Sequence, residues 1–162
     1  MTSSDADGIP FDRLSFAFLD EGARPITPHA ITLTGWWQGF APRLPRWRDF
    51  DFLDHAPYAA HLHLIKVRGP DRFEFRIAGD TTRDLLGRTE KGLVIHPDSD
   101  NAHHRNLVVY YNQIFLAARP GYVTGSVTDI NGITHHFESV DLPLLDDEGR
   151  PDSLVGIFAA LD

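Results

Sequence analysis

Residues 72–92, RFEFRIAGDTTRDLLGRTEKG, decide the fold that the sequence predicts. The first six residues alternate charged and apolar side chains, as in a strand that turns one face toward a core. Asp80 or Thr81 can then cap a short helix over 82–86, and Gly87 is the kind of residue that commonly closes a helix. The stretch therefore predicts a strand that leads directly into a short capped helix.

The segments on either side extend this unit. Residues 62–67 form a strand candidate that a short turn at 68–71 joins to the strand above, which predicts a β-hairpin. Residues 28–41 begin with proline at the first helical position and carry apolar residues at helical spacing. The longest predicted helix runs from a cap at 98–100 to about Ala118.

Three strands are predicted in the C-terminal third. Asn131-Gly132 is the strongest short hairpin signal, and it lies between strand candidates at 122–130 and 133–142. A further turn leads to a nearly continuous apolar strand at 153–161, which predicts a central place in the sheet. Together these elements predict an α+β fold with a five-stranded antiparallel sheet covered by helices on one face.

The length of 162 residues fits one domain with its own core. We expect a single domain over residues 27–162, preceded by a tail and a short packing segment at 1–26. In that segment Leu14, Phe16 and Phe18 alternate, which fits either a short strand or one amphipathic turn. Periodicity over so few residues does not choose between the two.

Composition excludes several classes of function. The chain has 23 acidic and 15 basic residues, a formal charge of -8 that repels nucleic acid and anionic lipid. It has no cysteine, so disulfides, thiolate metal sites and a cysteinyl–flavin bond are excluded. The N-terminus lacks a signal-peptide pattern, and the longest apolar run is too short to span a bilayer. We expect a cytoplasmic protein with no nucleic-acid or membrane partner.

The order of two strands, a helical middle that ends in one long helix, and a three-strand meander resembles PAS-like sensor domains. Local motifs indicate a bacterial branch of small single-domain PAS-like proteins, over residues 29–160. The motif residues are Trp36-Trp37, Pro45 with Asp49 and Asp51, Arg76 with Gly79, Gly87 and Gly92, Pro120, and Pro143-Leu144 before Asp146-Asp147. The family pattern differs at two places: it has arginine where Trp47 stands and proline where Phe52 stands.

The resemblance implies a non-enzymatic sensory or regulatory domain that acts in signal transduction through protein–protein contacts. It also implies that a small molecule can bind between the sheet and the helices, while its identity and any cofactor stay unknown. The chain shows no motif of hydrolases, nucleotide-binding proteins or zinc proteases, which also favours a non-enzymatic role. We expect a separate effector protein as partner, or a homodimer.

Two adjacent tryptophans lie on the predicted helix at 28–41. Because adjacent helical residues diverge by about 100°, one tryptophan is expected in the core and the other at a pocket or partner. We assign Trp37 to ligand binding. Trp36 and Phe40 are assigned to an interface, because this helix carries more apolar surface than one face needs.

Further ligand-binding candidates come from the middle of the chain. Arg76 matches a position of the family motif. Of the adjacent Tyr110 and Tyr111, one is expected in the core and one at the ligand. His104, or its neighbour His103, is placed to hold a cofactor such as haem from the long helix. A haem- or other cofactor-binding sensor or carrier is therefore an alternative.

A small α+β enzyme of the cone type is a second alternative. It needs a titratable residue in the cavity, for which Asp129, His135 and Asp141 are candidates. His61 and His63 have a spacing that suits metal ligation from one strand face. A polar strand face explains these two histidines equally well, and we expect no native metal site.

Overall fold

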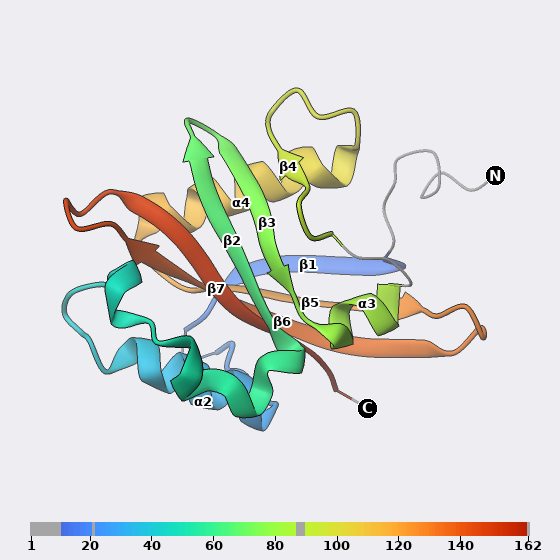
Figure 1. Ribbon diagram of the computed structural model, residues 1–162. Helices are drawn as coiled ribbons and strands as arrows, with labels where there is room; N and C mark the ends of the chain where they lie inside the picture. The colour runs from blue at the N-terminus through green and yellow to red at the C-terminus, as the bar shows by residue number, and fades with distance from the viewer. Residues whose placement is uncertain (1–10, 21, 87–89, 162) are drawn as a thin grey trace.

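The computed structural model describes residues 11–20, 22–86 and 90–161. Its strands are Arg13–Phe18 (β1), Leu62–Gly69 (β2), Arg72–Ala78 (β3), Val94–Ile95 (β4), Gly121–Thr128 (β5), Thr134–Leu145 (β6) and Pro151–Ala160 (β7). Its α-helices are Pro28–Gln38 (α2), Asp80–Leu86 (α3) and Ala102–Ala117 (α4), and two 3-10 segments are Trp47–Asp49 (η1) and Phe52–His61 (η2). One antiparallel sheet in the order β1-β5-β6-β7-β2-β3-β4 forms the centre (Figure 1).

The α+β class and the antiparallel sheet are confirmed. β2 pairs with β3 in the predicted hairpin, and β5, β6 and β7 form the predicted meander. Gly132 has a φ of +81°, the left-handed value that this turn requires of its glycine. β7 lies between β6 and β2, so the apolar C-terminal strand is central, as its composition indicates.

The sheet has two strands more than the five predicted. β1 pairs with β5, Phe16 opposite Val123, so the open choice at the N-terminal segment is settled as a strand. β4 pairs with β3 at the opposite edge. The periodicity of the sequence does not predict these two strands. β4 has only two residues, and β1 gains its regular structure by pairing with its neighbour.

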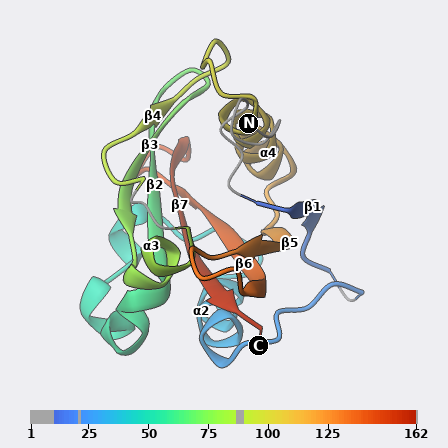
Figure 2. The same ribbon diagram turned by 90° about the vertical axis from the view of Figure 1, so that its right-hand side faces the viewer.

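The helices cover both faces of the sheet, which corrects the expectation of one covered face. Along β7, Val155 and Ile157 face α2, whereas Leu154 and Phe158 face α4. We call the α2 side the outer face and the α4 side the inner face (Figure 2). The near-continuous apolar sequence of β7 follows from this arrangement, because a central strand covered on both sides buries every side chain.

A buried carboxylate fixes the start of α2 to the outer face. Glu138 of β6 has no exposed surface. It accepts hydrogen bonds from the backbone N–H of Ile26 (2.9 Å) and of Thr27 (2.6 Å), and from the Tyr122 hydroxyl (2.6 Å). The Thr27 hydroxyl also donates to it (2.5 Å). The negative charge lies at the positive end of the helix dipole, which stabilises this contact.

The segment after α2, which contains Pro45 and the two motif aspartates, forms the two 3-10 segments η1 and η2. Asp49 accepts from the backbone N–H of Arg46 (2.8 Å), and this bond lowers the pKa of Asp49. Asp51 accepts from the backbone N–H of Leu53 (3.0 Å) and so caps η2. The two aspartates of the family motif therefore stabilise η1 and η2.

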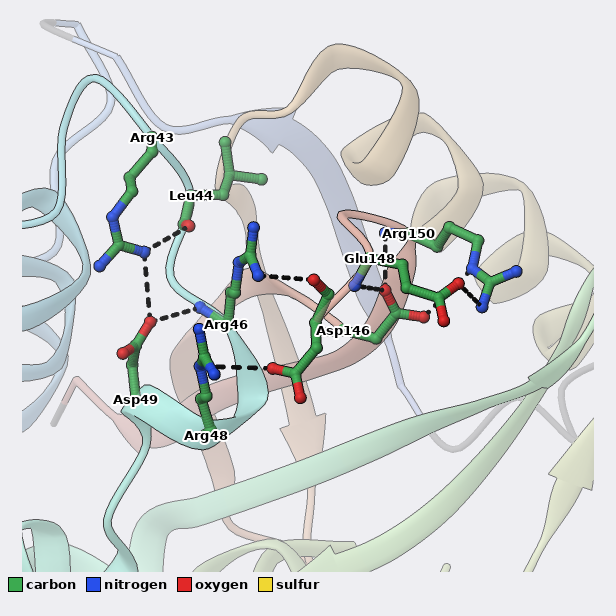
Figure 3. A network of polar contacts seen from close by, with 9 residues as sticks. Arg43, Leu44, Arg46, Arg48, Asp49, Asp146, Glu148 and Arg150 are labelled. Atoms are coloured by element: carbon green, nitrogen blue, oxygen red, sulfur yellow. Dashed lines mark hydrogen bonds and ion pairs between the residues drawn. The ribbon is translucent and has the colours of Figure 1, made fainter.

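An ionic network ties this segment to the turn between β6 and β7 (Figure 3). The Arg46 guanidinium donates to the backbone carbonyl of Asp147 (2.6 Å), and Arg48 Nε lies 3.3 Å from the Asp147 carboxylate. Arg43 pairs with Asp49 at 3.2 Å. Since Arg43 and Arg48 are more than half exposed, these ion pairs hold the segment in place but contribute little to stability.

The starts of α3 and α4 differ from the sequence-based expectation. Asp80 and Thr81, expected as caps, are the first two residues of α3. α4 begins after Asn101, one residue beyond the predicted caps, and the Asn101 side chain accepts from the backbone N–H of His104 (3.1 Å). At the end of β3, a Cβ on Gly79 would lie 2.3 Å from the carbonyl oxygen of Ala60, so only glycine fits there. The predicted helix closure at Gly87 lies outside the described residues.

Candidate functional site

A cavity of about 100 Å³ lies between the inner face, α4 and β1. Its walls are mostly aromatic and aliphatic, and β1 closes one side with Leu14 and Phe16. The Phe16 ring lies 4.9 Å from that of Tyr110, between centroids. The polar residues that line the cavity are His63, Thr82, Glu90, His103, His104, Tyr110, Tyr111, Ser139 and Asp141.

One row of residues crosses four strands and brings two polar residues, His63 and Asp141, to the cavity wall. His63 of β2 pairs with Gly156 of β7, Gly156 pairs with Asp141 of β6, and Asp141 pairs with Gly121 of β5. Asp141 thus has a glycine on each side. The register of three strand pairs brings these residues together.

The glycines make room for the two side chains that bind Asp141. A Cβ on Gly156 would lie 2.3 Å from His63 Nε2, and one on Gly121 would lie 2.3 Å from the Tyr110 hydroxyl. In the space that remains, His63 Nε2 lies 2.7 Å from Asp141 Oδ1, and the Tyr110 hydroxyl donates to Asp141 Oδ2 (2.6 Å). The buried carboxylate is therefore held by side chains from β2 and α4.

Burial and negative charge keep the two tyrosines protonated. Burial raises the pKa of Tyr110, and the charge of Asp141 raises it further. Burial also raises the pKa of Tyr111, with additional contributions from the charges of Asp141 and Glu90. Both hydroxyls are hydrogen-bond donors at neutral pH. The Thr82 hydroxyl is buried without a hydrogen-bond partner among the described residues, which leaves a polar atom for a bound molecule.

Three of the five predicted ligand-binding residues line this cavity. Tyr110, Tyr111 and His104 all come from α4, and His103 lines the cavity beside them. Tyr110 and Tyr111 are both core residues as well as cavity residues. We expected one tyrosine in the core and the other at the ligand, but both tyrosines belong to the core and both line the cavity.

The other two predicted ligand-binding residues lie away from the cavity. Trp37 is on the outer face, where its indole N–H donates to the carbonyl oxygen of Pro143 (2.9 Å). Arg76 is the extra residue of a β-bulge, since Leu64 pairs with Ile77 and Ile65 with Phe75. Arg76 does not line the cavity, and the Nε of its half-exposed side chain lies 4.0 Å from the Glu74 carboxylate.

The predicted interface residues pack on their own domain. The Trp36 ring makes edge contacts with Phe40, Phe50 and His55, with centroids 5.2–5.6 Å apart. Both Trp36 and Trp37 are half-buried against the outer-face core. Ile31 is the large apolar residue of α2 that stays exposed, at 51%.

The sequence points to Asp141, but not to its partners. Of the three enzyme candidates, Asp141 alone lines the cavity. Asp129 and His135 lie 2.7 Å apart at the β5–β6 hairpin, where Asp129 also accepts from the backbone N–H of Ile133. That pair shapes the turn. No local pattern predicts that His63 reaches Asp141, because the contact depends on strand order.

The two histidines with metal-ligand spacing lie on different sides of the sheet. His61 ends η2, stacks on His29 of α2 and lies 2.7 Å from the Thr81 hydroxyl through Nδ1. His63 lies in β2 on the inner face. In the part of the chain that the structure describes, no group of three or more His, Asp or Glu side chains is placed to hold a metal ion.

A large cofactor does not fit the cavity as it stands. Sites for drug-sized ligands occupy roughly 300–1,000 Å³, well above the volume here. His103 and His104 do line the cavity, but no arginine or lysine among the described residues lines it to hold the carboxylates of haem or the phosphate of a flavin nucleotide. The chain also lacks the cysteine for a flavin bond.

No helix within residues 11–20, 22–86 and 90–161 combines the length and the apolar character that a bilayer span requires.

The features described so far define an α+β domain with a small, partly polar cavity between a curved antiparallel sheet and one long helix. No family model matches the chain, and no curated protein matches it in sequence.

Solved structures of PAS and LOV proteins are similar to this chain. An RNA-binding Light-Oxygen-Voltage receptor superposes with a TM-score of 0.50 at 15% identity, over 94% of this chain and 39% of that one. The PAS domain of Bordetella pertussis BvgS (TM-score 0.41, 20% identity) covers 64% of this chain and 76% of its own. For a fungal LOV photoreceptor the TM-score is 0.43 at 20% identity, over 83% of this chain and 95% of that one.

The superposition on the Light-Oxygen-Voltage receptor shows that the chain has a PAS-like fold, as the order of its elements predicts. It spans about two fifths of the length of the RNA-binding receptor. Similarity at this level of identity establishes the fold, so the role of this chain has to be argued from its own site.

Proposed function

We propose that this chain is a non-enzymatic sensory domain that binds a small molecule in the inner-face cavity and signals through a protein partner. The observation that carries this proposal is the row centred on Asp141. A buried carboxylate held by His63 and Tyr110 beside a small aromatic cavity is a site that a ligand can rearrange. The PAS-like fold supports a signalling role for such a site.

β6 offers a direct route from the cavity to the surface of the domain. Asp141 faces the cavity, while Glu138, three residues earlier, binds the start of α2 on the opposite face. A ligand that shifts Asp141 along or about the strand would also shift the clamp on Ile26 and Thr27. The segment before α2 is thus the element whose position responds to the cavity.

We further propose that the partner contact, in the simplest case with a second copy, uses the exposed side of α2. Ile31 on α2 and Leu53 on the adjoining η2 are 51% and 79% exposed. Light scattering tests this contact: Ile31→Glu is expected to give a monomer, while Ile133→Glu at the exposed β5–β6 turn leaves the mass unchanged. A monomeric wild-type protein contradicts the dimer.

Native mass spectrometry of the purified chain tests the ligand proposal. We expect a retained small molecule, or a rise in melting temperature with members of a small-metabolite panel. Ala78→Phe fills the cavity and is expected to abolish both signals. Val109→Phe introduces the same side chain on the exposed side of α4 and is the control. Equal binding by the two variants would contradict a ligand site in this cavity.

A further inference from the structure

The hydroxyl oxygen of Thr82 lies at the cavity wall, buried and without a hydrogen-bond partner among the described residues. Buried polar groups in folded proteins are nearly always hydrogen-bonded, so this atom indicates a partner that the domain itself does not supply. A hydroxyl can donate one hydrogen bond and accept two. It therefore suits a neutral ligand group that contains oxygen.

The junction of β3 and α3 fixes the place of this hydroxyl. The backbone N–H of Gly79 donates to the carbonyl oxygen of Leu62 in β2 (2.9 Å), and that of Thr82 donates to the carbonyl oxygen of Gly79 (3.1 Å). The first turn of α3 is thus tied to the sheet. An anchor that is already held in place loses little conformational entropy when a ligand binds to it.

The charged groups of the wall do not call for a charged ligand. The Asp141 carboxylate is held by His63 and Tyr110, and the Glu90 carboxylate lies 3.9 Å from His104 Nε2. No lysine or arginine lines the cavity in the described part of the chain. Because a charge that leaves water without gaining a partner is strongly disfavoured, the cavity favours a neutral molecule over either ion.

The apolar part of the wall and the volume limit the body of the ligand. The apolar side chains on the sheet and α4 that line the cavity are Ile65, Phe75, Leu107, Val123, Phe137 and Phe158. An apolar protein cavity of about 150 Å³ binds benzene. The cavity here has about 100 Å³, so it admits an apolar body smaller than benzene.

We propose that the cavity binds a neutral molecule with one oxygen and an apolar body of about four carbon atoms, an alcohol or a ketone, whose oxygen is hydrogen-bonded to the Thr82 hydroxyl. This inference rests on the proposed sensory function and names the chemical class of its ligand. The apolar body lies against the rings of the inner face, where burial supplies the affinity. The Thr82 hydroxyl supplies the preference for a molecule that carries oxygen.

NMR titration of the full chain with four probes tests the chemical class. The probes have the same number of non-hydrogen atoms, and they are 1-butanol, cyclopentane, butylammonium and propionate. We expect 1-butanol to shift the amide signals of cavity residues and the two ions to leave them unchanged. Tighter binding of an ion than of 1-butanol, or binding of cyclopentane alone, overturns the inference and leaves the proposed function in place. Binding of none of the four overturns the inference, whereas the ligand proposal itself fails when native mass spectrometry and the metabolite panel also find no ligand.

Removal of one hydroxyl locates the contact. Thr82→Val keeps the shape of the side chain, so it is expected to lower the affinity for 1-butanol about three- to tenfold and to leave that for cyclopentane unchanged or higher. Thr82→Ser keeps the hydroxyl and is expected to keep the affinity for 1-butanol within that range of the wild type. Binding of cyclopentane also reports that each variant is folded.

The matched control is Thr81→Val, the same change at the preceding residue of α3. The Thr81 hydroxyl lies 2.7 Å from His61 Nδ1 and does not line the cavity. We expect this variant to bind 1-butanol and cyclopentane with the wild-type ratio of affinities. Equal affinity of the wild type and Thr82→Val for 1-butanol, or an equal loss in Thr82→Ser and Thr82→Val, overturns the inference.

Discussion

The two faces of the sheet each bury one carboxylate of β6, and they hold it in different ways. On the outer face Glu138 is bound by two backbone N–H groups and two hydroxyls. On the inner face Asp141 is bound by two side chains and borders open space. Backbone donors cannot turn away, whereas His63 and Tyr110 can rotate. Glu138 is therefore held more rigidly than Asp141.

The largest expected effect is on the free energy of unfolding, and it differs between the two carboxylates. Glu138→Gln places an amide NH₂ against the backbone N–H groups of Ile26 and Thr27 and is expected to cost about 3–5 kcal/mol, because two buried donors lose a charged acceptor and each such bond contributes about 1.5–3 kcal/mol. Asp141→Asn is expected to cost about 1–2 kcal/mol, because the asparagine can keep one acceptor and the neighbouring imidazole can change tautomer. Urea unfolding measures both. Equal losses would contradict the contrast between the faces.

A smaller loss of stability is expected at Gly156, which lies between His63 and Asp141 in the sheet. A Cβ on Gly156 would lie 2.0 Å from the backbone oxygen of Val140, so Gly156→Ala is expected to cost about 2–3 kcal/mol through overpacking. Gly35 of α2 has no heavy atom within 4 Å of the same added carbon. Gly35→Ala is the control and is expected to stabilise by about 0.5–1 kcal/mol. Chemical unfolding of the two variants gives the comparison, and a neutral Gly156→Ala would disprove the close packing.

The smallest effect concerns acid sensitivity on the outer face. His55 is buried there, stacked on Phe50 at 4.7 Å, and burial lowers its pKa against the opposing charges of Asp54 and Asp51. Because the unfolded chain binds this proton more tightly, stability is complete above about pH 6.5 and falls as the pH decreases. His55→Phe is expected to flatten the dependence of melting temperature on pH between 7 and 5. An unchanged slope would assign acid sensitivity elsewhere.

Local patterns were sufficient for most of the strands. The alternation at 72–77 and the Asn131-Gly132 turn predict β3 and the β5–β6 hairpin, because period and turn chemistry are properties of neighbouring residues. Sequence also indicates Asp141, Tyr110 and Tyr111 as candidate site residues, from residue type and element. Those inferences need no knowledge of what lies across the sheet.

Local sequence patterns do not predict which face of the sheet each helix covers. The apolar run of β7 shows that the strand is central, but helical periodicity in α2 does not tell which face the helix covers. Trp37 was therefore assigned to the ligand although its indole binds Pro143 on the outer face. A helix chooses its face through connections and complementary packing, which are long-range properties.

The sequence by itself determined the α+β class, the two hairpin units, the long helix and the absence of cysteine chemistry, since these follow from residue types and spacings along the chain. Only the tertiary structure decided which residues meet at the cavity. His63 and Asp141 are 78 residues apart and meet because β7 lies between their strands with Gly156 in register. Strand order and register are set by the packing of the whole sheet, and no pattern of neighbouring residues encodes them.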